Sequence, residues 1–297
     1  MNSTAPGDRR KAYLFLTLTT AIWGSLYVVT RIALETVPPI TLLLARYIIA
    51  SVALFALIRH GGHNMHIKRE DRKYFLFIGV VGYFVSVGAQ VIGTKYAGAS
   101  VASLINAMNP VFITLFAVLI LKEKLTAGKV IGTLATLAGA YVILGGAHGV
   151  GAVWGIGFSL LSVLLWSLTS VSVRHITRTY DPIVVTTYAV FLAMLCSIPA
   201  AGIELALTPH SGLFSLTNIL CFLYLGIVAT ALPNLLWNKS LSLIEASTCS
   251  LFYPIQPLVS VLLGITLLNE KVNINFGIGA VLIVGGILYA LLSERSK

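Results

Sequence analysis

The chain has 297 residues, of which 57% are hydrophobic and only 10% are charged, and its mean hydropathy is +0.92. These values exclude an ordinary soluble globular domain and indicate an integral membrane protein. The formal net charge of +10 comes from cations that lie mostly at the ends of apolar segments. This placement favours a role in membrane topology over nucleic-acid binding. The 3 cysteines lack metal-ligand or disulfide spacing, so we expect buried apolar side chains.

The apolar segments define the fold class. A bilayer core of ~30 Å needs about 20 apolar residues per helix, and several segments reach that length. Continuous apolar runs such as 111–121 exclude a β-barrel, whose strands alternate with a period of two. We therefore predict an all-α integral membrane protein with ten transmembrane helices, at approximately 12–32, 39–59, 74–94, 98–121, 126–146, 151–173, 183–204, 213–238, 245–268 and 273–292.

The distribution of cations orients these helices. With a cytoplasmic N-terminus, most of the 20 Lys and Arg fall on the cytoplasmic side. Arg31, Lys95 and Lys271 are external, and Arg46 lies inside the second helix. The positive-inside rule therefore predicts a multi-pass membrane protein with both termini in the cytoplasm. The first apolar segment has no small-residue cleavage site and is expected to be a retained helix.

An internal repeat divides the chain into two units of five helices, 1–146 and 151–297. Trp23 and Arg31 recur as Trp166 and Arg174. Five crossings are an odd number, so the second unit is predicted to be inverted, as in many secondary transporters. In the fourth and fifth helices the residues that recur in the ninth and tenth are Ala99, Ser100, Ser103, Leu104, Pro110, Leu121, Glu123, Lys124, Gly132 and Gly139, matched by Ala246, Ser247, Ser250, Leu251, Pro257, Leu268, Glu270, Lys271, Gly279 and Gly286.

Polar residues at intervals of three form one face of the fourth helix and a matching face of the ninth. Such side chains are costly in lipid and are expected to face protein or a wet cavity. Pro110 and Pro257 each remove a backbone hydrogen bond beside these faces, which predicts two interrupted helices with hinge points. A substrate site and simple helix packing both explain the pattern. The polar candidates are Ser103, Asn106, Asn109, Ser250, Tyr253 and Gln256.

Four other helices add candidate substrate-binding residues. Aromatic side chains with a polar tip line solute pockets, although they also form belts at membrane interfaces. Trp23 and Trp166 lie midway along their helices, which weakens the belt interpretation. Arg46 either pairs with a substrate carboxylate or holds the bundle together, and both roles stay open. The additional candidates are Trp23, Tyr27, Tyr83, Ser86, Gln90, Trp166, Asn234 and Trp237.

Several functional signatures are missing from the sequence. No Asp or Glu lies in the middle of a predicted helix, which favours a carrier that follows its substrate gradient over a proton-driven one. Phosphate-binding, zinc-protease and serine-hydrolase motifs are absent, so we expect no catalytic residues, cofactor or metal. The polar loop with His60, His63 and His66 is expected to be a solvated basic loop, because no carboxylate or cysteine completes a metal site. The expected partners are a small-molecule solute and membrane lipids, and no nucleic-acid partner is expected. A monomer is one of the oligomeric states that the sequence allows.

Several stretches together resemble the EamA-type exporters of the drug/metabolite transporter superfamily. They are WGS from Trp23, Ala45-Arg46-Tyr47, KYAGASVASLINAMNPVF from Lys95, LKEKLT, and ASTCSLFYPIQPLVSVLLGITLLNEKV from Ala246. The resemblance covers nearly the whole chain. It implies two inverted five-helix repeats around a cavity lined by the first, third, fourth, sixth, eighth and ninth helices. The fifth and tenth helices would pack outside.

The hypothesis from the sequence is a secondary transporter of the bacterial inner membrane that exports small organic metabolites, in the first place amino acids or related compounds. Alternating access would move helices about the site between the fourth and ninth. Cargo differs widely within the family, so fold-level analogy does not settle the substrate. A flippase for lipids or lipid-linked sugars is the alternative within transport. An intramembrane enzyme is the alternative from another class, although no paired acid and base support it.

Overall fold

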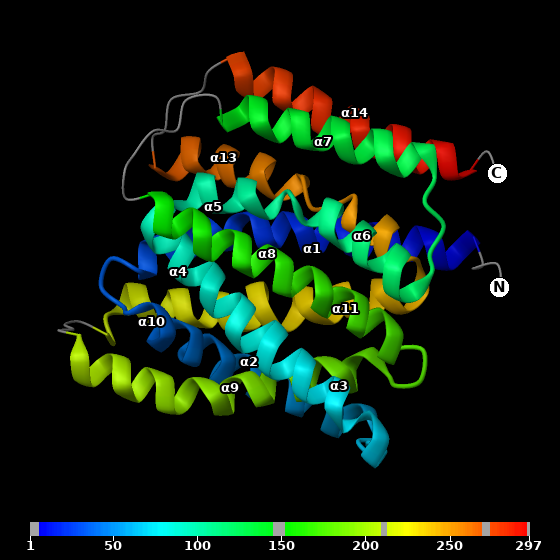
Figure 1. Cartoon of the computed structure of the whole chain (residues 1–297). Helices are drawn as coiled ribbons and strands as arrows, with labels where there is room; N and C mark the ends of the chain where they lie inside the picture. The colour runs from blue at the N-terminus through cyan, green and yellow to red at the C-terminus, as the bar shows by residue number, and fades with distance from the viewer. Residues whose placement is uncertain (1–5, 145–151, 209–212, 269–273, 296–297) are drawn as a thin grey trace.

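The computed structural model describes residues 6–144, 152–208, 213–268 and 274–295, and these residues form helices and connections without any strand (Figure 1). In chain order the helices are α1 (Pro6–Ala33), α2 (Pro39–Gly61), η1 (Arg69–Asp71), α3 (Arg72–Leu76), η2 (Phe77–Ser86), α4 (Val87–Ala97), α5 (Ala99–Asn106), α6 (Asn109–Leu121), α7 (Ala127–Leu144), α8 (Ala152–Ile176), α9 (Pro182–Leu207), α10 (Leu216–Leu223), η3 (Tyr224–Ala231), α11 (Leu232–Leu243), α12 (Ala246–Ser250), α13 (Ile255–Leu268) and α14 (Ile274–Arg295).

The all-α membrane character expected from the hydropathy is confirmed. Within the described residues, 7 helical stretches are long and apolar enough to cross a membrane, and α6 is a shorter apolar helix. Each predicted segment overlaps one helix or a run of consecutive helices. Proline starts two of them, because Pro39 and Pro182 occupy first-turn positions where no amide donor is needed. The count of ten crossings and the inversion of the second unit stay predictions.

Two helices contain a π-helical insertion at positions that the internal repeat matches. Insertion η2 begins at Phe77 in the first half, and η3 begins at Tyr224 in the second. A π-helix is hydrogen-bonded from residue i to residue i+5, and a carbonyl in each insertion also accepts a hydrogen bond from a side-chain hydroxyl. The Tyr47 hydroxyl donates to the Tyr83 carbonyl at 2.5 Å, and the Thr230 hydroxyl donates to the Leu225 carbonyl at 2.6 Å. Both insertions therefore bind side-chain partners instead of exposing backbone to lipid.

The fourth and ninth predicted helices are both interrupted near their prolines, as the sequence predicts. A turn separates α5 from α6, and Pro110 is the second residue of α6. A second turn separates α12 from α13, where Pro257 lies in the first turn. A proline in a first turn costs no intrahelical hydrogen bond, so these residues start new helices where the chain has already bent.

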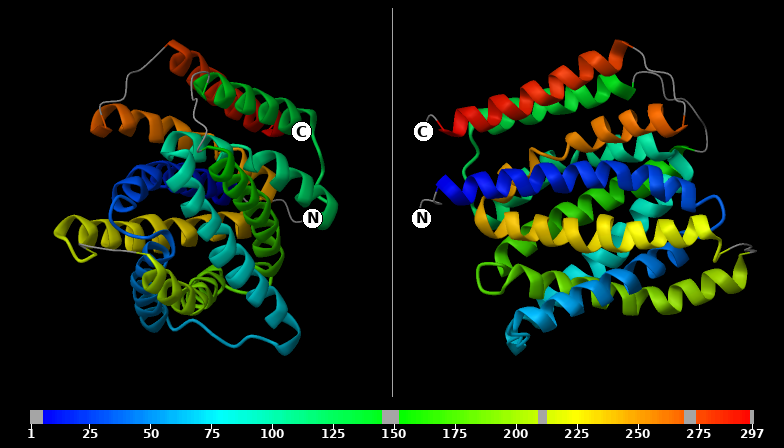
Figure 2. Two further views of the ribbon diagram at one scale, coloured as in Figure 1. Left: turned by 60° about the vertical axis from the view of Figure 1, so that its left-hand side comes forward. Right: turned by 180° about the vertical axis from the view of Figure 1, so that it is seen from behind.

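Helices α7 and α14 lie side by side along one flank of the bundle (Figures 1 and 2). Glycine permits their close approach, because a Cβ on Gly132 would lie 2.5 Å from the Ala290 Cβ and 2.8 Å from the Gly286 carbonyl oxygen. The other helices form the larger part of the bundle, where α1 contacts α11 and α13, and α8 contacts α4 and α6. Helices α7 and α14 lie outside this central group of helices, and the central group forms the cavity.

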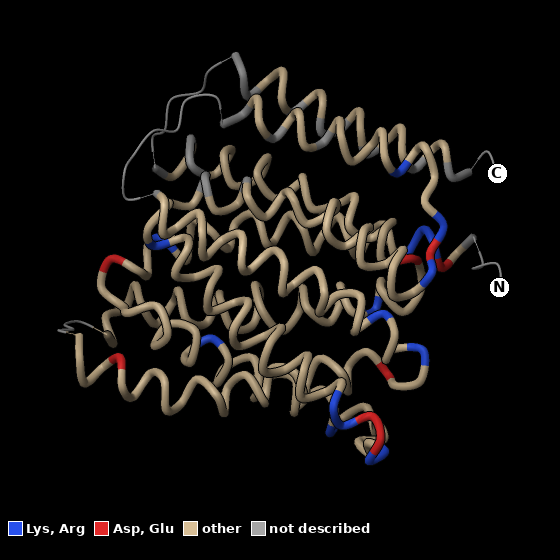
Figure 3. Tube along the Cα trace, viewed as in Figure 1, with Lys and Arg blue, Asp and Glu red and all other residues tan. Residues whose placement is uncertain are grey.

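Charged residues collect at one end of the bundle. Helix α1 begins and α14 ends at this end, and Lys and Arg are concentrated there (Figure 3). The loop between α2 and η1 belongs to the charged end, and its His63 Nδ1 lies 2.9 Å from the Asp181 carboxylate. Among the described residues, no group of three His, Cys, Asp or Glu side chains could hold a metal ion.

Candidate functional site

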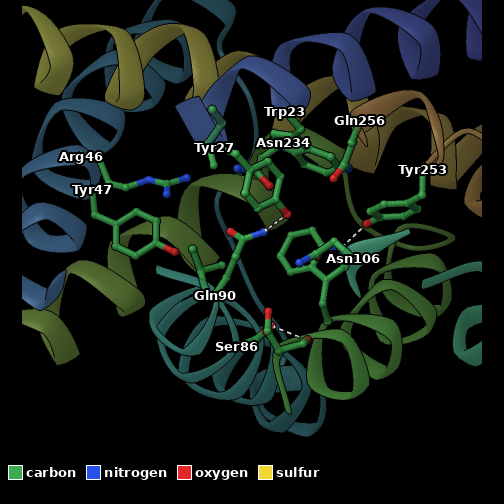
Figure 4. A pocket seen from close by; sticks show the side chains of 14 residues that line it. Trp23, Tyr27, Arg46, Tyr47, Ser86, Gln90, Asn106, Asn234, Tyr253 and Gln256 are labelled. Carbon is green, nitrogen blue, oxygen red and sulfur yellow. Dashed lines mark hydrogen bonds between the residues drawn. The ribbon is translucent and has the colours of Figure 1, made fainter. Parts of the chain in front are cut away.

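A buried cavity lies between the two halves of the chain, and it takes side chains from α1, α2, η2, α4, α5, α8, α11, α13 and the turn before α13 (Figure 4). Its volume is about 40 Å³. A water molecule needs roughly 10–15 Å³ of such space, so the cavity has room for a few waters. The lining residues are Trp23, Leu26, Tyr27, Arg46, Tyr47, Ser86, Val87, Gln90, Asn106, Ser162, Trp166, Asn234, Tyr253 and Gln256.

Aromatic rings form one wall of the cavity. The Trp23 ring lies 5.8 Å from the Trp166 ring in an edge-to-face arrangement and 5.9 Å from the Tyr253 ring in a stacked one. The Trp166 indole nitrogen donates to the Tyr253 hydroxyl. Trp237 lies behind this wall, with its ring 5.0 Å from that of Tyr253 and 5.5 Å from that of Trp23. Such contacts hold the rings in fixed orientations and provide an apolar surface for a solute.

Amide side chains supply polar groups from both halves. Gln90 Nε2 donates to the Tyr27 hydroxyl at 2.8 Å. Asn234 Nδ2 donates to the Thr230 carbonyl at 2.8 Å, which leaves its Oδ1 buried without a partner. Gln256 Oε1 is also buried without a partner. Unpaired buried acceptors are costly, and a ligand with hydrogen-bond donors would satisfy them.

The break between α5 and α6 is held by its own asparagines. Asn109 Nδ2 donates to the Asn106 carbonyl at 2.8 Å, and Asn106 Nδ2 donates to the Ala102 carbonyl at 3.2 Å. The Ser167 hydroxyl of α8 donates to Asn109 Oδ1 at 3.0 Å. These bonds satisfy carbonyl groups that the interrupted helix would otherwise leave bare.

Arg46 enters the cavity from α2, on the side opposite Tyr253 (Figure 4). Its side chain is buried, with 3% exposure. The guanidinium Nε donates to the Thr230 hydroxyl at 2.9 Å, whereas Nη1 is buried and has no partner. The guanidinium carbon also lies 5.8 Å from the centre of the Tyr47 ring.

The structure brings most of the sequence candidates together. Five others are buried outside the lining, where Tyr83 contacts Trp166, Trp237 contacts Trp23, and Ser250 donates to the Ser247 carbonyl. The candidates in the lining are Trp23, Tyr27, Arg46, Ser86, Gln90, Asn106, Trp166, Asn234, Tyr253 and Gln256. Those outside it are Tyr83, Ser103, Asn109, Trp237 and Ser250.

Sequence reasoning misses four lining residues, namely Leu26, Tyr47, Val87 and Ser162. Ser162 lies one helical turn before Trp166, and its carbonyl accepts a hydrogen bond from Ser86 at 2.9 Å. Helical spacing from Trp166 and the position of Tyr47 beside Arg46 are the available signals. Leu26 and Val87 carry no signal, because apolar residues also face lipid and core.

A charged cluster joins the two halves at the end of the bundle where α1 begins. Glu123, just after α6, accepts hydrogen bonds from the Ala246 and Ser247 amides at 2.9 and 3.1 Å and thereby caps α12. Lys129 is buried, with 1% exposure, and its ammonium donates to the Glu245 carboxylate and, at 2.7 Å, to the Ser247 hydroxyl. Residues of α7 and of the α6–α7 connection thus hold the start of α12.

The opposite end has a second carboxylate cap, and among the described residues no buried Lys or Arg contacts it. Glu204 of α9 accepts hydrogen bonds from the Ile40 and Thr41 amides, at 3.1 and 2.7 Å, and caps α2. The Thr41 hydroxyl also donates to Glu204 at 2.9 Å. Both caps place an anion at a helix N-terminus, where the helix dipole stabilises it.

An all-helical apolar bundle with a polar cavity between two duplicated halves is the architecture of a membrane transporter. The sequence profile of the EamA-like transporter family matches the chain twice, at residues 10–145 and 153–292. The chain therefore belongs to the EamA-like transporter family, and the resemblance noted from the sequence motifs is confirmed.

Individual relatives agree with this assignment. An uncharacterized transporter of Archaeoglobus fulgidus is 27% identical over 96% of this chain and 100% of its own length. The uncharacterized transporter YcxC of Bacillus subtilis is 26% identical over 96% of this chain and 94% of its own. A solved crystal structure shares the fold with a TM-score of 0.79 at 22% sequence identity and covers 95% of this chain and 98% of that one.

Proposed function

We propose that this chain is a secondary transporter that exports small organic metabolites, with amino acids and related compounds as the first class of cargo. The observation that carries the proposal is the buried cavity, which both halves build beside two interrupted helices at matching positions. Substrate sites of transporters with repeated halves lie at such interfaces. Aromatic and amide side chains suit a solute with apolar and polar parts.

The proposed topology has ten crossings in two inverted units of five helices. Helices α1 and α8 begin their halves at opposite ends of the bundle, which supports the inversion (Figure 1). The gathering of Lys and Arg at the end where α1 begins supports cytoplasmic termini in a bacterial inner membrane.

Alternating access is the proposed mechanism. A cavity of about 40 Å³ is too small for an amino acid, so cargo can enter only after helices move apart. The turns before Pro110 and Pro257 are the proposed bending points, because no continuous helical ladder crosses them. The described residues that line the cavity include no Asp or Glu, which supports transport without a built-in proton site.

The first test is uptake of a panel of labelled amino acids into proteoliposomes containing the purified protein, with and without an imposed pH gradient. Saturable uptake without the gradient is expected, and the labelled compound would identify the cargo class. Uptake that requires the gradient would overturn gradient-independent transport. Absence of uptake under both conditions would overturn amino-acid transport and favour the lipid-linked cargo.

Two cavity variants test the site itself. Asn106→Ala and Tyr253→Ala should each lower uptake about tenfold or more at unchanged abundance in the membrane, because each removes a polar group from the lining. Tyr141→Ala is the matched control, since Tyr141 is 79% exposed on α7, away from the cavity. Unchanged uptake by both cavity variants would remove these residues from the site.

A further inference from the structure

We propose that Arg46 binds a carboxylate group of the cargo, and that the cavity therefore selects small zwitterionic or monoanionic carboxylates with an apolar side chain. This inference rests on the proposed transport function and assigns the cargo's charged group to one residue. It also decides between the two roles that the sequence leaves open for Arg46.

The first argument is the unsatisfied charge. Arg46 is 3% exposed, and its Nε donates a hydrogen bond to Thr230, while Nη1 is buried without a partner. A guanidinium stays charged at physiological pH and is very costly to bury without compensation. The described residues that line the cavity include no carboxylate to neutralise it. An anionic ligand would supply the missing partner.

The second argument is that the chain holds Arg46 in one orientation. The Thr230 hydroxyl donates to the Leu225 carbonyl at 2.6 Å inside η3, so its lone pairs remain for Nε of Arg46. Gly226 permits the close approach of η3 to α2, because a Cβ there would lie 2.6 Å from the Ile49 Cβ and 3.1 Å from the Arg46 carbonyl oxygen. A residue that only filled space would not need this arrangement. The π-helical insertion therefore positions the guanidinium at the cavity.

The third argument is the complementary set of acceptors. Asn234 Oδ1 and Gln256 Oε1 are buried without partners and line the same cavity (Figure 4). One cationic donor with two neutral acceptors matches a ligand that has one carboxylate and a group rich in donors, such as an ammonium. A phosphate carries more negative charge than this single cation neutralises. The aromatic wall of Trp23, Trp166 and Tyr253 suits the apolar remainder.

The decisive test compares L-leucine, L-phenylalanine and L-valine with their carboxamides, which differ from the acids by the loss of one negative charge. Binding to the purified full-length protein is followed by intrinsic tryptophan fluorescence, since Trp23 and Trp166 line the cavity. Uptake into proteoliposomes is measured in parallel. We expect at least one acid to bind about tenfold or more tightly than its carboxamide, in line with a charge-assisted hydrogen bond.

Variants assign this preference to Arg46. Arg46→Gln should abolish the difference between acid and carboxamide, and Arg46→Lys should retain part of it because it keeps the charge. Arg31→Gln is the matched control, since Arg31 is exposed at the end of α1 and donates to the Lys95 carbonyl at 3.2 Å. The control should leave the preference unchanged.

The outcomes separate the two proposals. Tighter binding of acids without any uptake would contradict the transport function and leave the carboxylate site standing. Uptake with equal preference for acids and carboxamides would overturn the carboxylate site and leave transport standing. Retention of the full preference in Arg46→Gln would also overturn it. If Arg46→Gln fails to fold, the comparison of acids and carboxamides in the unmodified protein decides.

Discussion

The two ends of the bundle are closed by different chemistry although the chain is built from a repeat. At the end where α1 begins, the buried Lys129 of the first half contacts Glu245 and Ser247 of the second. The residues that the repeat matches to Lys129 and Glu245 are Phe276 and Gly98, which carry no charge. The duplication therefore reproduces the helices but not this ion pair.

The matched arginines show the same difference. Arg174 at the end of α8 is partly buried and donates to the Leu241 carbonyl at 2.5 Å, whereas the corresponding bond from Arg31 is 3.2 Å long and exposed. Separating the halves at the charged end would hydrate Lys129 and break its contacts with Glu245 and Ser247. The comparison teaches that a chain built from a repeat can hold its two ends with different contacts.

The largest effect is expected from Glu245→Ala. This change removes the Glu245 carboxylate from the ammonium of Lys129, whose side chain is 1% exposed. Removing one member of a buried pair typically costs about 3 kcal/mol or more. The unfolding midpoint of the detergent-purified protein, followed by tryptophan fluorescence, should fall accordingly. Glu35→Ala is the control, because Glu35 is exposed at the opposite end. An equal loss in both variants would contradict a special role for the charged end.

A smaller effect is expected from Lys129→Met at the same contact. Methionine fills similar space without a charge, and the remaining Glu245 side chain is 35% exposed and can be hydrated. We expect a loss of about 1–2 kcal/mol, because replacing a buried charge by an apolar group avoids an uncompensated one. Lys124→Met, at an exposed position nearby, should change the same unfolding midpoint little. A larger loss of stability than in Glu245→Ala would show that Lys129 makes stabilising contacts in addition to its pair with Glu245.

The helices of this chain could be predicted because their signal is local. Runs of about 20 apolar residues locate membrane helices whatever packs against them. The interruptions near Pro110 and Pro257 were also predictable, since proline and the neighbouring polar residues lie within one segment. The π-helical insertions η2 and η3 were not, because Gly82, Thr230 and the apolar residues around them fit a regular helix equally well.

The helix faces that form the candidate site could be predicted from the sequence. The distance of each side chain from the cavity could not. Tyr83 and Trp237 share faces with lining residues, yet their rings pack behind the aromatic wall. Spacing along a helix gives the direction of a side chain and leaves its distance from the cavity undetermined. The role of Lys129 was also hidden, because its partners Glu245 and Ser247 lie in the other half of the chain.

The smallest effect is expected from Glu204→Gln, at the end opposite Lys129. Glutamine retains an acceptor for the Ile40 and Thr41 amides but loses the charge at the start of α2, for which we expect about 0.5–1 kcal/mol. The same unfolding midpoint should fall slightly. Glu35→Ala, a nearby change at an exposed position that leaves this cap intact, serves as the control.

Combining cap variants with Glu245→Ala tests whether the two ends are independent. Glu204→Gln and Glu245→Ala lie at opposite ends and share no partner, so their losses should add within about 0.5 kcal/mol. Glu123→Gln and Glu245→Ala should deviate from additivity by more, because the Ser247 hydroxyl contacts both Glu123 and the Lys129 ammonium, which is also the partner of Glu245. Additive losses in both pairs would mean that the cluster is a set of separate contacts, and the charged end would then have no cooperative resistance to opening.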